Sequence, residues 1–273
     1  MDYPFEQVLV PLDGSRAAER ALAPALELVR RTRVALRLLS RALPGEKEEL
    51  AGYLSDLADR HAAVTDVETE VVDVESIPDA ITAGIEPGTL VCVSSHGRGR
   101  SEALVGSVTE AVLRTLGQPV LVVGPDVPEG TTLGDGRIVA CLDGSDLSER
   151  TLDPARAWSM SLGLPLWLTQ VAPPDLAVEQ RTHGDVIEGG YLAALAHQTG
   201  GVEGWDILHD QHPAHGLARY AATEPVAMLV LATHGRTGWD RLRLGSVTAA
   251  TVRHGPVPVL VVPALAQPAA AKI

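Results

Sequence analysis

Short apolar runs alternate with amphipathic stretches along the first half of the chain. A strand buried on both faces is a continuous apolar run, and a helix that covers it has one apolar face. The pattern therefore predicts five strands alternating with four helices, which is typical of a parallel sheet covered on both faces. The predicted strands are 7–12, 34–39, 67–74, 90–93 and 120–123, and the predicted helices are 16–33, 46–63, 78–85 and 102–116.

Residues 127–136 interrupt this pattern, and the same order of elements then begins again. The interruption is rich in Gly, Pro and Thr, which favour turns, so we expect it to link two domains, 1–126 and 137–265. In the second domain the predicted strands are 138–142, 164–171, 202–208, 226–232 and 258–262. The first predicted helix of this domain ends near residue 162, and the other three span 186–198, 213–223 and 245–253.

Four short motifs occur in the same order in both halves. Asp-Gly-Ser follows the first strand at 13–15 and 143–145, and His-Gly-Arg follows the fourth strand at 96–98 and 234–236. Gly-Ser-Val-Thr at 106–109 and 245–248 begins the last helix, and Pro-Val-Leu-Val-Val at 119–123 and 258–262 forms the last strand. A repeat of several blocks in one order indicates an internal duplication.

Composition narrows the class of protein. The 273 residues suit two domains, and hydrophobic residues make up 45% of the chain although aromatic residues make up only 3%, so the cores must consist of Ala, Val and Leu. A net charge of −13 argues against nucleic acid or an anionic membrane as the main partner. With no signal-like N-terminus and no apolar run of about 20 residues, we expect a cytoplasmic protein.

The two cysteines, Cys92 and Cys141, lie inside apolar strand-like runs. No Cys-x-x-Cys spacing is present, so buried, reduced thiols are expected rather than a redox pair.

The order strand, glycine-bearing loop, helix N-terminus, strand in residues 226–262 suits the binding of an anion. Glycine lets the backbone approach a phosphate closely, and a helix N-terminus offers unpaired N–H groups with partial positive charge. Residues 91–123 have the same order and form the second candidate site.

Taken together, these motifs resemble the universal stress proteins, and the resemblance covers both halves. The nucleotide-binding members of that family carry Gly-x2-Gly-x9-Gly-(Ser/Thr). The second half has Ala232-x2-Gly235-x9-Gly245-Ser246, in which only the first glycine is replaced. The first half has Ser94-x2-Gly97-x8-Gly106-Ser107, which differs at the first position and is one residue shorter in the loop.

The resemblance implies a fold, a ligand and a set of binding residues. It implies two open, Rossmann-like five-stranded parallel sheets with strand order 3-2-1-4-5. It also implies ATP as ligand, with Mg²⁺ or Mn²⁺ as a companion ion. The implied binding residues are Asp143, Val171, Ala232, Gly235, Arg236, Gly245, Ser246, Val247 and Thr248 in the second half, and Asp13, Gly97, Gly106, Ser107 and Thr109 in the first.

Two substitutions favour the second site over the first. The resemblance places a hydrophobic residue against adenine at the end of the second strand, where the second half has Val171 and the first has Arg41. Ser107 and Glu110 also form a capping-box pattern, which would engage the Ser107 hydroxyl in its own helix.

Several candidate residues fit a purely structural role as well. Asp13 and Asp143 suit a helix cap as well as a ribose or metal contact, because a duplication copies caps too. His96 and His234 are more consistent with bracing the loop than with phosphate binding. His209, His212 and His215 are spaced like metal ligands, but Pro213 interrupts the segment and no Cys or carboxylate pattern completes a ligand set, so a metal site is disfavoured.

The functional hypotheses belong to three classes. The first is a regulatory stress-response protein that holds ATP, and the second is an interaction module of the same fold without nucleotide. The third, an enzyme, is disfavoured, although slow ATP hydrolysis stays open: no GxGxxG follows the first strand and no GxxxxGK[ST] is present.

The last strand of each half is short and apolar, so an uncovered edge would invite pairing. We therefore expect 119–123 and 258–262 to pair as an intramolecular pseudo-dimer, and a further homodimer stays open.

Overall fold

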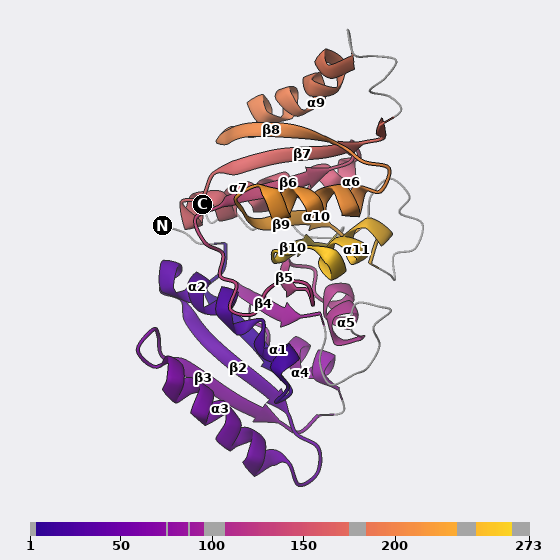
Figure 1. Ribbon diagram of the computed structural model, residues 1–273. Coiled ribbons are helices and arrows are strands. Elements are labelled where there is room, and N and C mark those ends of the chain that lie inside the picture. The colour runs from indigo at the N-terminus through magenta and orange to yellow at the C-terminus, as the bar shows by residue number, and fades with distance from the viewer. Residues whose placement is uncertain are drawn as a thin grey trace.

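Ten strands form one continuous sheet in the part of the chain that the computed structural model describes (Figure 1). The structure describes residues 4–74, 76–86, 88–95, 107–174, 184–233 and 244–263. The strand order is β3-β2-β1-β4-β5-β10-β9-β6-β7-β8. Each half therefore has the expected order 3-2-1-4-5, and all neighbours within a half are parallel. The predicted fold class is confirmed.

The strands keep close to the predicted apolar runs. They are β1 (Gln7–Leu12), β2 (Ala35–Arg41), β3 (Val67–Val72), β4 (Thr89–Ser94), β5 (Val120–Val123), β6 (Arg137–Leu142), β7 (Leu166–Ala172), β8 (Val202–His209), β9 (Val226–Ala232) and β10 (Val259–Val262). The central strands are buried almost throughout, because helices cover both faces of the sheet.

The helices divide between the two faces of the sheet (Figure 1). One face is covered by α1 (Arg16–Glu19), α2 (Leu22–Thr32), α3 (Lys47–His61), α6 (Asp146–Glu149), α7 (Leu152–Leu162) and α9 (Gly184–Thr199). The other is covered by α4 (Ile77–Gly84), α5 (Ser107–Thr115), α10 (Pro213–Thr223) and α11 (Ser246–His254). Each face has one hydrophobic core that runs through both halves.

One feature differs from the expected pair of sheets: the two five-stranded sheets are joined into one. β5 and β10 pair antiparallel, with Leu121 opposite Leu260. Both strands are fully buried, whereas an open edge of this kind would expose unpaired backbone groups beside apolar side chains. The sequence predicted that 119–123 and 258–262 pair, and the strands within these two segments are the ones that pair here.

The first predicted helix of each half is broken into two. α1 ends at Glu19 and α2 begins at Leu22, and the second half repeats the break between α6 and α7. In a continuous helix the ring of Pro24 would clash with the carbonyl of Arg20, four residues earlier. The break places Pro24, and likewise Pro154, in the first turn of a new helix, where proline is tolerated.

Contacts outside the sheet also bind the halves together. The ring of Phe5 lies 5.2 Å from the ring of Trp158 in α7, and both residues are buried. Arg31 of α2 donates to the carbonyl of Leu162 at 3.4 Å and to the carbonyl of Gly134 in the linker at 2.6 Å. Arg31 therefore ties the first half both to the linker and to the second half.

The outer strands β3 and β8 carry polar side chains on one face. Glu68 is exposed in β3 and Glu203 in β8, which is typical of protected sheet edges. Within the described residues, no helix is long and apolar enough to cross a bilayer.

The first prediction concerns the close approach of the two halves at Gly124. A Cβ at this position would lie 1.8 Å from the carbonyl oxygen of Val252 in α11. We expect Gly124→Ala to lower the free energy of unfolding by about 2 kcal/mol, because the backbone must shift to accept a methyl group. Gly52→Ala in α3, where a Cβ meets nothing within 4 Å, should instead raise it by up to about 1 kcal/mol. Urea unfolding measures both, and an unchanged Gly124→Ala would contradict the close contact.

The second prediction concerns Glu27, which binds Arg30 and Arg31 with hydrogen bonds of 2.6 to 2.8 Å. The hydrogen bond to Arg30 is the main cause that lowers the pKa of Glu27 to about 2. A lowered pKa contributes stability that is present above the unfolded value of 4.5 and is lost as the pH falls toward 2. Glu27→Gln should therefore cost up to about 1 kcal/mol at pH 7 and nothing near pH 2, as measured by denaturation across this range. A cost that is independent of pH would argue against the ion pair.

Candidate functional site

The candidate residues gather at the carboxyl-terminal edge of the sheet, at two points where the strand order switches. β1 lies between β2 and β4, and β6 lies between β7 and β9. Asp13 therefore follows a strand next to the one that ends at Ser94, and Asp143 follows a strand next to the one that ends at Ala232. Ligands of open α/β sheets bind at such switch points.

The Asp-Gly-Ser turn has the same geometry in both halves. Gly14 and Gly144 have φ of 77° and 79°, a left-handed conformation that favours glycine. The Asp13 carboxylate accepts from the N–H of Ser15 at 2.9 Å. The Ser15 hydroxyl oxygen in turn accepts from the N–H of Ala18 at 3.2 Å and is the N-cap of α1.

The second half repeats this turn with additional hydrogen bonds. Asp143 Oδ1 accepts from both the N–H and the hydroxyl of Ser145, at 3.0 and 2.6 Å. Ser145 is the N-cap of α6. In both halves the serine, and not the aspartate, therefore caps the helix, while the aspartate holds the turn that precedes it.

The N-terminus of α11 offers backbone donors without a side-chain cap. Gly245 is the N-cap, and its own N–H donates to the carbonyl of Thr233 at 2.6 Å. The first helical hydrogen bond runs from Ala249 to the carbonyl of Gly245, so the N–H groups of residues 246–248 precede it. Ser246 and Val247 are exposed at this end of the helix.

These contacts define the roles of two residues of the motif. The N–H of Gly245 is engaged inside the turn, so the donors of this site are those of the following residues. Ser246 is the first residue of α11 and not its cap. In the first half α5 begins at Ser107, and the capping box of Ser107 with Glu110 stays a prediction, because the side chain of Ser107 lies outside the described part of the chain.

Thr109 and Thr248 fasten the two helices to the strands before them. Thr248 Oγ1 donates to the carbonyl of Ala232 at 2.7 Å, and Thr109 Oγ1 donates to the carbonyl of Ser94 at 3.2 Å. Both threonines are buried. Their hydroxyl hydrogens are therefore engaged at the strand ends, and they position the helix N-termini.

The glycine-bearing loops lie outside the described residues. Gly97, Gly106, Gly235 and Arg236, and with them His96 and His234, fall in these segments, and the side chain of Ser107 is not described either.

The ends of the second strands differ between the halves as the sequence indicates. Arg41 is the last residue of β2, and its Nε donates to the carbonyl of Val74 at 2.8 Å. Val171 stands at the corresponding place in β7 and is half-buried. It packs close to Gly216 of α10, where an added Cβ would lie 3.2 Å from Val171 Cγ1. Site one thus has a guanidinium where site two has an aliphatic side chain.

The histidine and cysteine candidates have local partners. His215 Nδ1 lies 2.8 Å from Asp210 Oδ2, and Arg219 lies 3.2 Å from the same oxygen. In the part of the chain that the structure describes, no group of three or more His, Cys, Asp or Glu residues is arranged to hold a metal. Burial raises the pKa of the thiols of Cys92 and Cys141 well above the usual value.

Sequence reasoning missed a polar cluster on the α10 side of the second half. Trp167 Nε1 donates to Asp206 Oδ2 at 2.7 Å, and the Tyr220 hydroxyl donates to the same oxygen at 2.6 Å. The guanidinium carbon of Arg137 lies 4.2 Å from the centre of the Trp167 ring. The local signal was a tryptophan between two leucines at the start of a strand, but its partners come from three other elements.

The third prediction uses two buried threonines of α11. The Thr251 hydroxyl makes no hydrogen bond among the described residues, and the sixth residue of α5, at the corresponding place, is Val112. Thr251→Val should raise the free energy of unfolding by about 1 kcal/mol, because it removes a buried group without a partner. Thr248→Val should lower it by about 1 kcal/mol, because the Ala232 carbonyl loses its donor. Urea unfolding tests both, and two changes of the same sign would contradict these assignments.

Comparison with known proteins agrees with this geometry. Universal stress protein Rv2005c of Mycobacterium tuberculosis is 28% identical over 206 residues, which cover 71% of this chain and 68% of that protein. Universal stress protein Rv1996 of the same organism is 25% identical over an alignment of 308 positions, which covers 93% of this chain and 94% of that protein. The crystal structure of a universal stress protein from Archaeoglobus fulgidus superposes with a TM-score of 0.67 at 20% identity, covering 95% of this chain and 98% of that one.

The sequence profile of the universal stress protein family matches this chain twice, over residues 4–124 and 136–263. Each match contains one set of the repeated motifs and one half of the sheet. The chain therefore belongs to the universal stress protein family and carries two copies of its domain in tandem.

Proposed function

We propose that this chain is a stress-response regulatory protein that binds ATP at the switch point of its second half. Occupancy of that site would change its partner or its assembly state, and catalysis is not its main role. The observation that carries the proposal is the N-terminus of α11. Its N-cap is a glycine and its first residues are exposed. They lie at the edge of the sheet where Asp143 follows the end of β6.

The second half suits each part of an adenine nucleotide. The N–H groups of residues 246–248 precede the first helical hydrogen bond and are suited to a phosphate. Glycine at 245 keeps side-chain atoms away from that end of the helix. Val171 supplies the aliphatic contact for a base, and Asp143 is fixed by Ser145 for the ribose or for a cation. In this proposal Gly235 and Arg236 of the loop complete the phosphate contacts.

The first half suits the same ligand less well. Arg41 is tied to the carbonyl of Val74, so a guanidinium stands at the strand end where an aliphatic surface is wanted. The loop of this half is also one residue shorter than its counterpart. We therefore assign weak or no nucleotide binding to Asp13, Gly97, Gly106, Ser107 and Thr109.

A divalent cation would be held with the phosphates and not by protein ligands alone. Asp143 is the one described carboxylate at this switch point that fits Mg²⁺ or Mn²⁺, and a magnesium ion bound with a nucleotide typically takes only one or two protein carboxylates. The ion would neutralise phosphate charge when bound.

The two domains act as an intramolecular pseudo-dimer in this proposal. Since β5 and β10 already pair with each other, a homodimer would have to use other surfaces.

The fourth prediction tests the nucleotide directly. Mass spectrometry of small molecules released from denatured, freshly purified protein should identify an adenine nucleotide. Gly245→Val should reduce its retention at least about tenfold, equivalent to about 1.4 kcal/mol, because the added side chain obstructs the helix N-terminus. Gly106→Val, the matched change in the first half, should alter retention little.

Two further variants control for folding and for the base contact. Urea unfolding separates loss of ligand from loss of structure in the glycine variants. Val171→Arg places the residue of the first half into the second and should also reduce nucleotide retention. Equal losses from Gly106→Val and Gly245→Val would refute the asymmetry, and absence of any nucleotide would favour the interaction module without ligand.

A further inference from the structure

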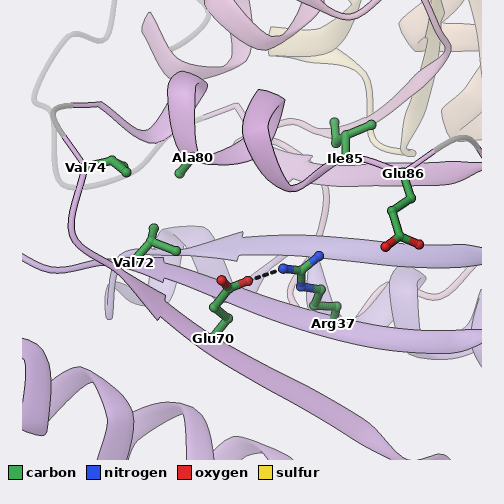
Figure 2. Close-up of a pocket in the computed structure, with 7 residues that line it drawn as sticks. All are labelled: Arg37, Glu70, Val72, Val74, Ala80, Ile85 and Glu86. Carbon is green, nitrogen blue, oxygen red and sulfur yellow. Dashed lines mark hydrogen bonds and ion pairs between the residues drawn. The ribbon is translucent and has the colours of Figure 1, made fainter.

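A cavity of about 340 Å³ lies between α4 and strands β2 and β3, apart from the nucleotide site. Figure 2 shows Arg37 and Glu70 on the strands, with Glu86 pointing toward them from the α4 side. The remaining lining is aliphatic and comes from Val72, Val74, Ala80 and Ile85. The volume falls in the range of small-molecule pockets, and so does the combination of an apolar lining with a few polar groups.

The described polar groups that line this cavity carry an excess of negative charge. Two carboxylates face one guanidinium among the lining residues, and Arg37 pairs with Glu70 through Oε2 of that carboxylate. Glu86 is exposed, and its carboxylate has no ion pair among the described residues. The cavity therefore favours a cation that has an apolar part.

The duplicated half shows what this arrangement of carboxylates accommodates. Asp206 of β8 lies opposite Thr169 of β7 in the sheet register, and Glu70 of β3 lies opposite Leu39 of β2 in the same way. Glu224 precedes a proline and β9, just as Glu86 precedes a proline and β4. The two carboxylates of the cavity therefore have counterparts in the second half.

In the second half a guanidinium occupies the space between those counterparts. The nitrogens of Arg137 lie 3.8 Å from Asp206 and 3.5 Å from Glu224. The same guanidinium stacks on Trp167, 4.2 Å from the ring centre. An internal side chain thus neutralises both carboxylates, and an indole fills the adjoining space.

The first half keeps the carboxylates and lacks both of these side chains. The guanidinium of Arg37 pairs with Glu70, and Glu86 is left without an ion pair among the described residues. Gln7 opens β1 where Arg137 opens β6, and its side-chain oxygen accepts from Thr89 at 3.4 Å. Arg37 lies opposite Leu9 in the sheet register, as Trp167 lies opposite Val139, so Arg37 occupies the position that corresponds to Trp167. Gln7 has a neutral amide where Arg137 has a guanidinium, and Arg37 has a narrower side chain where Trp167 has an indole. The cavity lies in this region of the first half.

We propose that this cavity binds a small organic cation, with a guanidinium head on Glu86, whose carboxylate has no ion pair among the described residues, and a short aliphatic tail against Val72, Val74, Ala80 and Ile85. Its contact with Glu86 corresponds to the contact of Arg137 with Glu224 in the second half. A primary ammonium offers the same charge without the planar donor pattern, so it binds less tightly.

The fifth prediction is tested with n-butylguanidinium, n-butylammonium and n-butanol, by calorimetry at low salt and by NMR of labelled methyl groups. The guanidinium should bind several-fold more tightly than the ammonium and at least about tenfold more tightly than the alcohol. The methyl signals of Val72, Val74, Ala80 and Ile85 should shift. Absence of guanidinium binding, equal binding of the alcohol, or shifts confined to other residues would overturn the proposal.

Two variants test the assigned groups. Glu86→Gln should weaken guanidinium binding about tenfold, the loss expected for one charge-assisted hydrogen bond, whereas Glu48→Gln on the surface of α3 should not. Gln7→Arg supplies the internal guanidinium of the second half and should abolish binding while the melting temperature stays the same or rises. Unchanged affinity in both Glu86→Gln and Gln7→Arg would refute the site. Nucleotide retention should be the same in all of these variants, which separates this site from the proposed ATP site.

Discussion

The antiparallel pairing of β5 with β10 is the interaction on which the rest of this structure depends. Each half ends in four buried aliphatic residues, Val120–Val123 and Val259–Val262. A strand of this kind at the edge of a sheet leaves backbone donors and acceptors unpaired beside apolar side chains. Pairing the two edges gives the backbone donors and acceptors of each strand partners in the other. It also makes the hydrophobic core on each face of the sheet continuous through both halves.

This pairing places the two switch points in one sheet, although their surroundings have diverged. The backbone geometry is preserved, as the φ values of Gly14 and Gly144 show. The side chains next to it are not, since Arg41 stands where the other half has Val171. Duplication supplied two equal frameworks, and single substitutions near the strand ends give them different chemistry.

The same divergence explains the contrast between the cavity under α4 and the cluster around Trp167. A half-buried cluster of a guanidinium, an indole and a phenol around one carboxylate is stable when its polar groups have partners. The second half meets this requirement, and Gly204 makes room for the indole, because a Cβ there would lie 2.2 Å from the Trp167 ring. The first half has Glu68 at the position of Gly204, so the ring could not be accommodated in the same way.

Hydrogen-bond competition also limits which groups of the nucleotide motif can meet a ligand. The N–H of Gly245 and the hydroxyl of Thr248 are engaged by the carbonyls of Thr233 and Ala232. These contacts hold the helix N-terminus against the strand end. In the proposed nucleotide site, the contacts from the described part of this motif would therefore come from the backbone N–H groups that follow Gly245, which the motif alone does not reveal.

The sequence by itself determined the class of fold, the duplication and the approximate bounds of the strands. The reason is that burial on two faces requires continuous apolar runs, and helices that cover them need one apolar stripe. It also predicted Asp13 and Asp143 at strand ends, because parallel strands bring their carboxyl ends to one edge. These features depend on local periodicity and on motifs a few residues long.

Only the tertiary structure decided which groups are engaged and which spaces are filled. That Ser15 and not Asp13 caps its helix depends on turn geometry, and the breaks before Pro24 and Pro154 depend on a clash with a carbonyl four residues away. The cluster around Trp167 joins residues from four elements. The cavity in the first half depends on the volumes of side chains from α4, β2 and β3. Distances between segments far apart in the chain are set by packing, and periodicity carries no information about them.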